Sequence, residues 1–577
     1  MRTRTAGASL SRGVRPAAAL LACALFAGAC TSSGATAAPE GAPTVEEMAA
    51  EAGRDVVRSL WRGYYPGRSG DVLLVTAPHS VMGTWGSGVR GPNDPRTSHA
   101  VPWDYLARVP IALWGPGFVR EGVREDRPVT VADLAPTFAA MMGFPWEAPD
   151  GRPLVEALAP AEGPPKAIVL IVHDGGGWNV LEEWADDWPV GARLMREGAV
   201  YTNATVGSAP PVTAPVHATM GTGAFPRTHG MPEIVGRLPD GSIGEVYFDR
   251  ADPSLLEVES VADAWDRSQG NRAWVGLVGF ESWHLGMMGK GAAAEGGDRD
   301  LAVIWDRNEE RWYANEEFYS FPDYLPGREV LDAHVEELDA ADGARDGAWM
   351  ENDLSDPARI PGTPAYAAYV GDVVLEMIER EPIGDDDVTD LLFVNLKPTD
   401  FGGHIWNYLS EEQRQALAMQ DRVVAEILAA LDREVGRGEY VVAMTADHGQ
   451  TPNPAVTGGH RVDKFKVADA VNAYFGHEIV ETTSPDDLYL YRDRLQDAGI
   501  TVEAVARFVG TIPVREVLPD GTDLEAIAEA ELDAPAFAAA LPGGWLESLT
   551  PRRIDAIDPG LYPEGDLTTP PDVGPPG

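Results

Sequence analysis

One threonine has the surroundings expected of a catalytic nucleophile. Thr213 lies in the run PPVTAPVHATMGTG, which spans residues 210–223. A buried hydroxyl is a poor nucleophile until its pKa falls, and a divalent cation bound to the oxygen lowers that pKa directly. Pairs of carboxylates and histidines elsewhere in the chain could hold such cations. We therefore expect Thr213 to act as a nucleophile beside bound metal ions.

Three apolar runs of strand length end at acidic residues or histidines. Residues 167–174 read AIVLIVHD and precede three glycines. Residues 390–396 read DLLFVNL and lead to Asp400 and His404, and residues 440–449 read YVVAMTADHG. Such runs are typical of strands buried on both faces, whose carboxyl ends meet at the ligand crevice of an open α/β sheet. Because all three runs bring Asp, or Asp with His, to that edge, the sequence predicts a metal centre there.

The types of these residues indicate both the metal and the reaction. Zn²⁺ accepts imidazole nitrogen together with carboxylate oxygen, and a catalytic zinc site keeps one position open. Asp and His ligands without cysteine fit Zn²⁺ best, although Mn²⁺ or Fe could occupy a similar site. Two such ions would stabilise both the attacking and the leaving oxygen of an in-line phosphoryl displacement. We therefore expect two divalent ions and the hydrolysis of phosphate esters.

Each motif taken alone has an ordinary explanation. An Asp-His pair such as Asp447-His448 is usually a solvated turn, and Asp400 with His404 could be an exposed pair on one helix face. A threonine followed by x-Pro, as at Thr213, often caps a helix because proline is tolerated in the first helical turn. The occurrence of compatible ligands at the ends of three apolar strands is what favours a metal centre.

The motifs together also resemble a known family, the alkaline phosphatase superfamily, in particular its nucleotide pyrophosphatase/phosphodiesterase branch. The resemblance extends from about residue 164 to about residue 450, and the motifs come in the family's order. They are Asp174 after a strand, Thr213 in Thr-x-Pro-x-His, Asp400-x-x-Gly-His404 and Thr-Ala-Asp447-His448-Gly. The resemblance implies an alkaline-phosphatase-like α/β sandwich with a central, mostly parallel sheet flanked by helices.

The resemblance also assigns ligands and a mechanism. One metal would be held by Asp174, Thr213, Asp447 and His448. The other would be held by Asp400, His404 and one further histidine. The implied reaction is that of a phosphodiesterase or nucleotide pyrophosphatase: Thr213 attacks phosphorus, a phospho-threonine forms, and a metal-bound hydroxide hydrolyses it.

The further histidine is expected from an unusual part of the chain. Family members take it from a segment well beyond the Asp-His-Gly motif, and the segments that resemble it here lie near the N-terminus, between about residues 69 and 138. We interpret the chain as a circular permutant, which needs the original termini to lie close together at the surface. His99 then completes the second metal site. His460 is the alternative, because it follows Asp447 closely in sequence.

The order of segments follows from these assignments. Short runs such as residues 488–491 and 502–509 suggest a small α+β insertion after the core, and amphipathic runs at residues 363–381 and 410–434 predict helices that connect parallel strands. The predicted segments are a signal peptide of lipoprotein type over 1–30, a tether over 31–44, a permuted closing segment of the catalytic domain over 45–158, a linker over 159–165, the catalytic core over 166–462, an α+β insertion that returns to the core over 463–557 and a disordered tail over 558–577.

The sequence does not determine which phosphate esters the protein prefers as substrates. The asparagine that the phosphodiesterase branch places after the nucleophile is missing, and Lys290 and Arg299 are at best a divergent form of the Lys-x-Arg pair of the monoesterases. The leading hypothesis is that the protein is a phosphodiesterase or nucleotide pyrophosphatase. The alternatives are a phosphomonoesterase of alkaline phosphatase type, and a lipoprotein of the same fold that binds ligand or transfers a headgroup without hydrolysis. A sulfatase is disfavoured because Thr213 is not the convertible Cys or Ser of that branch.

The N-terminus predicts export. Arginines precede the apolar run 17–27, which is too short to span a bilayer and is arranged like a secretory signal. Cys30 resembles the lipid-attachment residue of bacterial lipoproteins, with plain secretion as the alternative. Only one other cysteine, Cys23, is present, so the folded part has no disulfide. We expect an exported cell-envelope protein whose contact with the membrane is a lipid anchor.

Charge narrows the expected partners. The formal net charge is −45 and the isoelectric point is near 4.5, so binding of a nucleic acid polymer is not expected, because phosphate backbones are bound by clustered Lys and Arg. A small phosphate ester is still allowed, since bound divalent ions reverse the local field. The sequence does not indicate an oligomeric state.

Overall fold

The computed structural model describes residues 35–83, 96–341 and 343–560. The predicted signal peptide, Cys30 and nearly all of the predicted tail lie outside these residues. No helix within them is both long and apolar enough to cross a membrane.

Within the described residues, a ten-stranded sheet forms the centre of the protein. Its strands are, in spatial order, β12 (Arg311–Tyr313), β11 (Leu301–Asp306), β10 (Val275–Gly279), β15 (Asp390–Leu396), β6 (Ala167–His173), β16 (Tyr440–Thr445), β3 (Arg108–Trp114), β7 (Ala199–Thr205) and β4 (Val123–Glu125), with β5 (Val129–Thr130) also paired to β7. The five strands from β11 to β16 are parallel, whereas β12 and β3 are antiparallel to their neighbours. The predicted mostly parallel sheet is confirmed.

Strand β6 shows why these runs are largely apolar. Ile168, Leu170 and Val172 pack into a core on one face of the sheet, whereas Val169 and Ile171 pack into the core on the other face. Alternate residues of a strand point to opposite faces, so a strand with helices on both sides needs apolar residues at every position. The first core also contains residues of α4 (Leu134–Met141), α7 (Thr213–Thr222) and α10 (Val261–Ser268).

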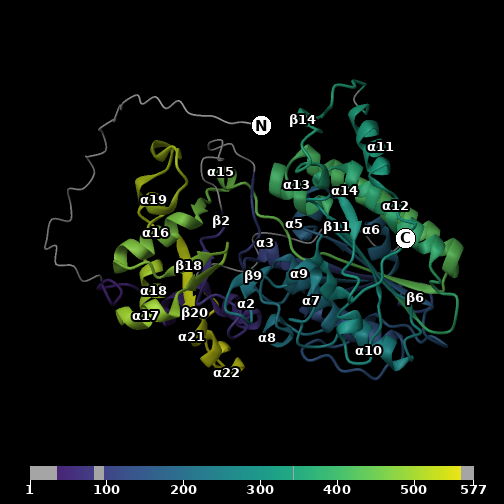
Figure 1. Ribbon diagram of the computed structural model, residues 1–577, viewed down its shortest axis with the longest axis horizontal. Helices are drawn as coiled ribbons and strands as arrows, with labels where there is room; N and C mark the ends of the chain where they lie inside the picture. The colour runs from purple at the N-terminus through teal and green to yellow at the C-terminus, as the bar shows by residue number, and fades with distance from the viewer. Residues whose placement is uncertain (1–34, 84–95, 342, 561–577) are drawn as a thin grey trace, which may run out of the picture.

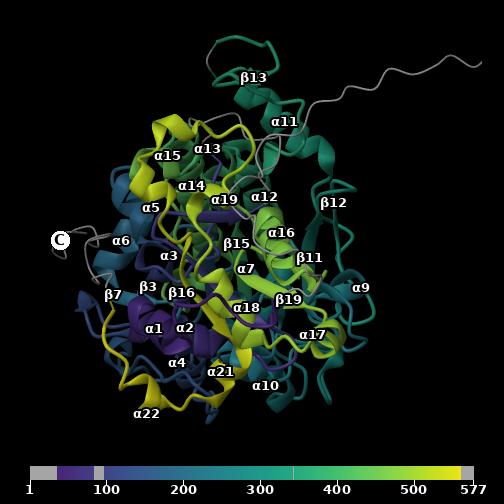
Figure 2. The ribbon, with the colours of Figure 1, turned by 90° about the vertical axis from the view of Figure 1, so that its left-hand side faces the viewer.

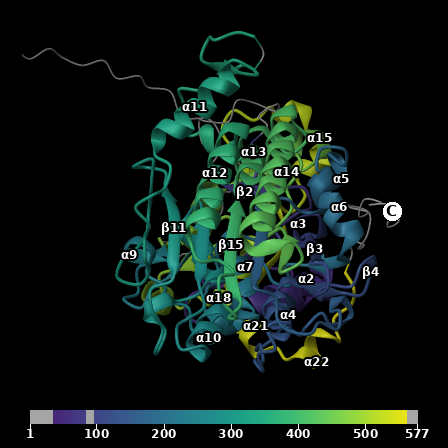
Figure 3. The same cartoon turned by 90° about the vertical axis from the view of Figure 1, so that its right-hand side faces the viewer.

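The two predicted connecting helices cover the other face. They are α12 (Pro364–Arg380) and α14 (Glu411–Leu431), and they lie side by side over β11 and β15 (Figure 3). Thr363 and Ser410 begin them as N-caps, each accepting a backbone N–H bond three residues on. Beyond them, α11 (Arg328–Asp339) and the hairpin of β13 (Ala348–Trp349) and β14 (Asn352–Asp353) project from the body of the protein (Figure 2).

A second, four-stranded sheet lies beside the large one (Figure 1). Its strands are, in order, β18 (Val480–Thr483), β19 (Asp487–Leu490), β1 (Val72–Thr76) and β20 (Phe537–Pro542). Three of them come from the predicted α+β insertion, but β1 comes from the N-terminal segment that the sequence assigns to the catalytic domain. A buried apolar run such as VLLVT does not reveal which sheet it joins, because that depends on antiparallel partners more than 400 residues away.

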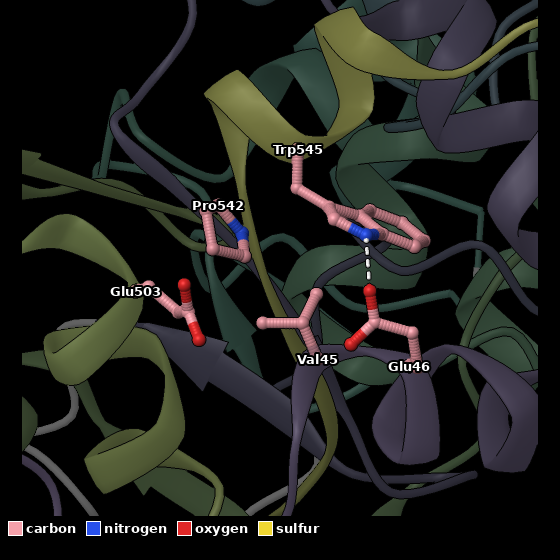
Figure 4. Close-up of a pocket in the computed structure, with 5 residues that line it drawn as sticks. All are labelled: Val45, Glu46, Glu503, Pro542 and Trp545. Atoms are coloured by element: carbon pink, nitrogen blue, oxygen red, sulfur yellow. Dashed lines mark hydrogen bonds between the residues drawn. The ribbon is translucent and has the colours of Figure 1, made fainter.

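Helices from both ends of the described chain pack on this small sheet. The second core combines residues of α1 (Val45–Ala52) and α2 (Arg54–Gly63) with residues of α16 (Lys464–Phe475) and α18 (Val502–Val509). The Trp545 indole N–H on α21 (Gly543–Ser548) donates to Glu46 on α1, at the edge of a hollow of about 270 Å³ (Figure 4). The N-terminal and C-terminal segments therefore form one unit.

The N-terminal segment also reaches the strand end that precedes the Asp-His motif. Strand β3 pairs with β16 and β7, and the Gly449 N–H donates to the carbonyl of Leu106 at 2.8 Å. The backbones are so close that a Cβ at Gly449 would lie 2.2 Å from the Tyr105 carbonyl oxygen. Position 449 therefore requires glycine, because the two backbones are too close together to leave room for a side chain.

We predict that Gly449→Ala lowers the free energy of unfolding by about 1–3 kcal/mol or more, because the added methyl overlaps the backbone of another segment. Chemical denaturation measures the loss. Gly163→Ala is the matched control, since a Cβ there meets no atom within 4 Å and the change should stay within about 0.5 kcal/mol. Equal stability of the two variants would show that the N-terminal segment does not pack as described.

Candidate metal centre

Thr213 is the first residue of a helix that is buried along its whole length. All ten residues of α7 are buried, and Thr213 itself is 1% exposed. The residue before it, Val212, is extended and offers no capping side chain. The first N–H groups of a helix lack intrahelical partners and give its N-terminus a partial positive charge, which suits a phosphate. The Thr213 hydroxyl therefore lies where an anionic group would be stabilised.

The three predicted carboxylates meet at the carboxyl ends of β6, β15 and β16. Asp174 follows β6, Asp447 follows β16, and Asp400 lies on α13 (Pro398–Trp406), directly after β15. His448 Nε2 lies 3.6 Å from Asp174 Oδ1, 3.5 Å from Asp447 Oδ2 and 3.7 Å from Asp400 Oδ1. The side chains of all four residues are at most 3% exposed. The structure thus brings them to one buried point.

Backbone conformation at the end of β6 allows this convergence. Gly175 has a φ of +68°, and a Cβ there would lie 2.2 Å from the Gln450 side-chain nitrogen and 3.0 Å from the Asp400 Cα. A residue with a side chain would be strained in this left-handed conformation and would displace Asp400. The Gly175 N–H also donates to Asp447 Oδ1 at 3.0 Å, which joins the ends of two strands.

His99 and His404 approach Asp400 from opposite parts of the chain. Their Nε2 atoms lie 3.4 Å and 3.3 Å from Asp400 Oδ1. Each uses its other ring nitrogen to donate to a backbone carbonyl, His99 to Pro211 at 3.1 Å and His404 to Thr97 at 2.9 Å. His460 belongs to none of the metal-ligand groups found among the described residues, and its backbone N–H is bonded to Ser80.

The donor set fits divalent cations. Asp400 Oδ1, Asp447 Oδ2 and His448 Nε2 are buried without a hydrogen-bond partner, and polar atoms in a protein interior almost always have one. The His448 Nδ1–H donates to the Gly449 carbonyl at 2.8 Å, so its Nε2 lone pair faces the carboxylates. Three groups of potential ligands are found here: Asp174 with Asp447 and His448, Asp400 with His99 and His404, and Asp174 with His217 and His284.

Burial adjusts the charges of this centre. Burial lowers the pKa of His448 to about 3, and the neighbouring His99 lowers it further, so the imidazole is neutral, as metal ligation requires. Burial also raises the pKa of Asp447 well above its ordinary value, and the charge of Asp174 raises it more. A cation would oppose that shift, because it favours the charged carboxylate.

Lys397 is a residue of the centre that the sequence reasoning misses. Its Nζ lies 2.8 Å from Asp400 Oδ2, 3.0 Å from Asp174 Oδ1 and 3.5 Å from Thr213 Oγ1. Burial alone would lower the pKa of Lys397, but Asp174 and Asp400 raise it above its ordinary value, so it is charged. A signal was present in the sequence, because Lys397 directly follows a mostly apolar strand and lies three residues before Asp400, which makes that carboxylate its expected partner.

His284 is a second residue whose role needs the structure. Its Nε2 lies 3.2 Å from Asp174 Oδ2, which also accepts a bond from Asn395 Nδ2 at 2.9 Å. The same Asn395 amide donates to His217 Nε2 at 3.2 Å, while His217 Nδ1 donates to the Thr213 carbonyl at 2.8 Å. These partners fix the orientation of Asp174 and the first turn of α7, and such contacts commonly tune a metal ligand.

The segment that carries Lys290 and Arg299 begins near the C-terminal end of α7. Gly221, near the C-terminal end of α7, lies against the carbonyls of Gly286 and Met287, from which the chain leads on to Lys290 and Arg299. Ten residues of α-helix span about 15 Å, so this loop starts at the far end of α7 from Thr213.

Comparison with known proteins assigns the chain to a family. The sequence pattern described as type I phosphodiesterase / nucleotide pyrophosphatase matches residues 168–490. Alkaline phosphatase PafA of Elizabethkingia meningoseptica is 24% identical over 400 residues, which cover 60% of this chain and 73% of that protein. A protein named calcium-transporting ATPase from Myroides odoratus is 26% identical over 344 residues, which cover 50% of this chain and 61% of that protein.

The crystal structure of wild-type PafA matches with a TM-score of 0.49 and 18% identity, over 61% of this chain and 77% of that chain. The family match covers more than half of the 577 residues and contains the Asp174, Thr213, Asp400-x-x-Gly-His404 and Asp447-His448 motifs. The chain therefore belongs to the type I phosphodiesterase / nucleotide pyrophosphatase family and is a hydrolase of phosphate esters.

Proposed function

We propose that the protein is a metal-dependent phosphodiesterase that acts through a covalent phospho-threonine at Thr213. The observation that supports this proposal best is the meeting of three buried carboxylates at His448 Nε2, with oxygen and nitrogen atoms that have no partner within the described residues. Lys397, which contacts two of these carboxylates, lies 3.5 Å from the Thr213 hydroxyl oxygen. Isolated buried carboxylates are costly, so a site of this kind needs cations.

Two cations would have separate ligand sets. Asp174, Thr213, Asp447 and His448 would hold one, and Asp400, His404 and His99 would hold the other, with Zn²⁺ as the best match to these donors. When bound, the cations lower the pKa of the threonine hydroxyl and of an attacking water and stabilise negative charge on the phosphoryl oxygens.

The residues of the chain perform the remaining work of the first step. The Thr213 hydroxyl releases its proton to solvent and its oxygen attacks phosphorus. The bond from phosphorus to the leaving oxygen breaks, and the leaving alkoxide takes up a proton from solvent to become the alcohol. The N–H groups at the start of α7 face the transferred phosphoryl group, where they stabilise its charge without rearranging. Lys397 adds a fixed positive charge 3.5 Å from the attacking oxygen.

The second step releases the enzyme. Water attacks the phospho-threonine, the bond from phosphorus to the Thr213 oxygen breaks, and the hydroxyl is restored. Lys397 stabilises the departing threonine oxygen as it regains negative charge. The contacts of His217 and His284 keep Thr213 and Asp174 in the same place through both steps.

The distribution of cations favours a diester over a monoester substrate. A monoester brings an additional negative charge, and the loop with Lys290 and Arg299 begins at the far end of α7. A phosphomonoesterase is the second candidate, because the relative PafA is named an alkaline phosphatase.

Circular permutation and export remain part of the proposal. The family match begins at residue 168 and leaves the segment with His99 outside it, as expected if that segment has moved from the other end of the family's chain. Lipid attachment at Cys30 would hold the enzyme at the cell envelope.

Substrate class and nucleophile are tested together. We predict that the zinc-loaded enzyme hydrolyses bis-p-nitrophenyl phosphate with a higher kcat/KM than p-nitrophenyl phosphate. Thr213→Ala should lower both rates by at least about 10³-fold, because it removes the attacking oxygen. Thr213→Ser is the matched control and should keep measurable activity and yield a phospho-serine detectable by mass spectrometry. Full activity of Thr213→Ala would exclude the covalent mechanism, and a preference for the monoester would favour the second candidate.

The second metal site is tested by metal content. We predict two ions per chain for the wild type, one for His99→Ala and two for His460→Ala, measured by plasma mass spectrometry after gel filtration. Loss of an ion in His460→Ala with retention in His99→Ala would contradict the ligand assignment and, with it, the permutation.

A further inference from the structure

A second group of carboxylates lies away from the metal centre. Asp266 is on α10, and Asp298 and Asp300 are on the irregular segment that leads into β11. Each offers a carboxylate oxygen, and these oxygens lie within 4.8 Å of one another. Residues two apart in an extended segment point to the same side, so Asp298 and Asp300 face Asp266 together while Arg299, which is exposed, points elsewhere.

Asp300 is buried in this group without a partner. It is only 8% exposed, and its carboxylate makes no hydrogen bond or ion pair within the described part of the chain. Asp266 is 3% exposed and accepts one backbone bond, from Ala273 at 2.9 Å. No described lysine or arginine pairs with Asp266, Asp298 or Asp300. A buried carboxylate of this kind is normally paired or coordinates a metal.

A fourth carboxylate adds to the negative charge. Asp263, on the same helix as Asp266, is buried and accepts bonds from the backbone N–H groups of Ser260, Lys290 and Gly291 at 2.8–3.1 Å. Burial raises the pKa of Asp300 well above its ordinary value, and Asp263, Asp266 and Asp298 raise it further. Burial raises the pKa of Asp266 to about 7, with Asp298 as the next cause. Burial and mutual repulsion therefore disfavour the ionised forms of Asp266 and Asp300.

We propose that Asp266, Asp298 and Asp300 bind a hard divalent cation, of which Ca²⁺ fits best. All three side chains offer only oxygen, and no histidine or cysteine belongs to the group, which disfavours Zn²⁺. Ca²⁺ tolerates irregular geometry and mixed carboxylate, carbonyl and water ligands, whereas Mg²⁺ requires a nearly ideal octahedron. Asp298 is exposed, so water can complete the coordination from that side.

The cation would tie together two parts of the fold. Asp266 belongs to α10, which packs on the large sheet, whereas Asp298 and Asp300 end the glycine-rich segment 289–300. That segment follows the short helix η4 (Ser282–Met287), which carries His284, the partner of Asp174. Binding would therefore stabilise a segment that continues from the metal centre, and this role is independent of the proposed reaction.

Calorimetric titration of the zinc-loaded, full-length enzyme with CaCl₂, after removal of free calcium on a chelating resin, tests the proposal. We expect one Ca²⁺ per chain with a Kd of about 10⁻⁵–10⁻³ M, and a higher Tm at saturating Ca²⁺. Asp300→Asn, which keeps the shape of the side chain, should weaken binding at least tenfold and abolish the rise in Tm. Asp298→Asn, at an exposed position, should weaken binding in the same direction even if Asp300→Asn folds poorly.

Two controls locate the binding. Asp387→Asn changes an exposed carboxylate that pairs with Arg272 at 3.3 Å, and it should leave the Ca²⁺ affinity unchanged. Asp174→Asn changes the metal centre and should also retain the Ca²⁺ titration. Absence of Ca²⁺ binding to the wild type, equal affinity of Asp300→Asn and Asp298→Asn to the wild type, or loss of binding in Asp174→Asn would each overturn the proposal.

Discussion

The structure depends on the mutual repulsion of three carboxylates that the fold holds at one buried point. Asp174, Asp400 and Asp447 each place an oxygen within 4 Å of the same His448 nitrogen, and like charges held this close together in a buried site destabilise one another. Lys397 is the permanent cation that contacts two of them. One positive charge does not balance three negative ones, which is why we propose that divalent cations complete the site and that the same cations make Thr213 reactive.

The scaffold is arranged to hold these charges in place. Parallel strands β6, β15 and β16 end at the same edge, helices bury both of their faces, and α7 presents its N-terminus to the same point. His99 arrives from a segment that also supplies β3 to the large sheet and β1 to the small sheet. A ligand on a segment tied into both sheets is held more firmly than one on a free loop, which matters because a metal ligand must keep its position when the ion leaves and returns.

Much of this arrangement could be predicted from the sequence, and the residues and strands that could not be predicted share one property. The runs at β6, β15 and β16 are largely apolar, so the sequence alone predicts both the strands and the edge that bears Asp174, Asp400 and Asp447. Lys397, His284 and Asp300 could not be assigned in that way. Each has a partner more than 30 positions away, which is Asp174 for Lys397 and His284 and is Asp266 for Asp300, and local periodicity contains no record of such partners. The same holds for β1, whose sheet depends on partners in the last 100 residues.

Anomalous diffraction at the zinc edge, from crystals of the wild-type protein grown with Zn²⁺, tests the central claim most directly. We expect two peaks, one among Asp174, Thr213, Asp447 and His448 and one among Asp400, His404 and His99, with Lys397 still contacting the carboxylates between them. Absence of both peaks, with the carboxylates paired only to Lys397, would contradict it.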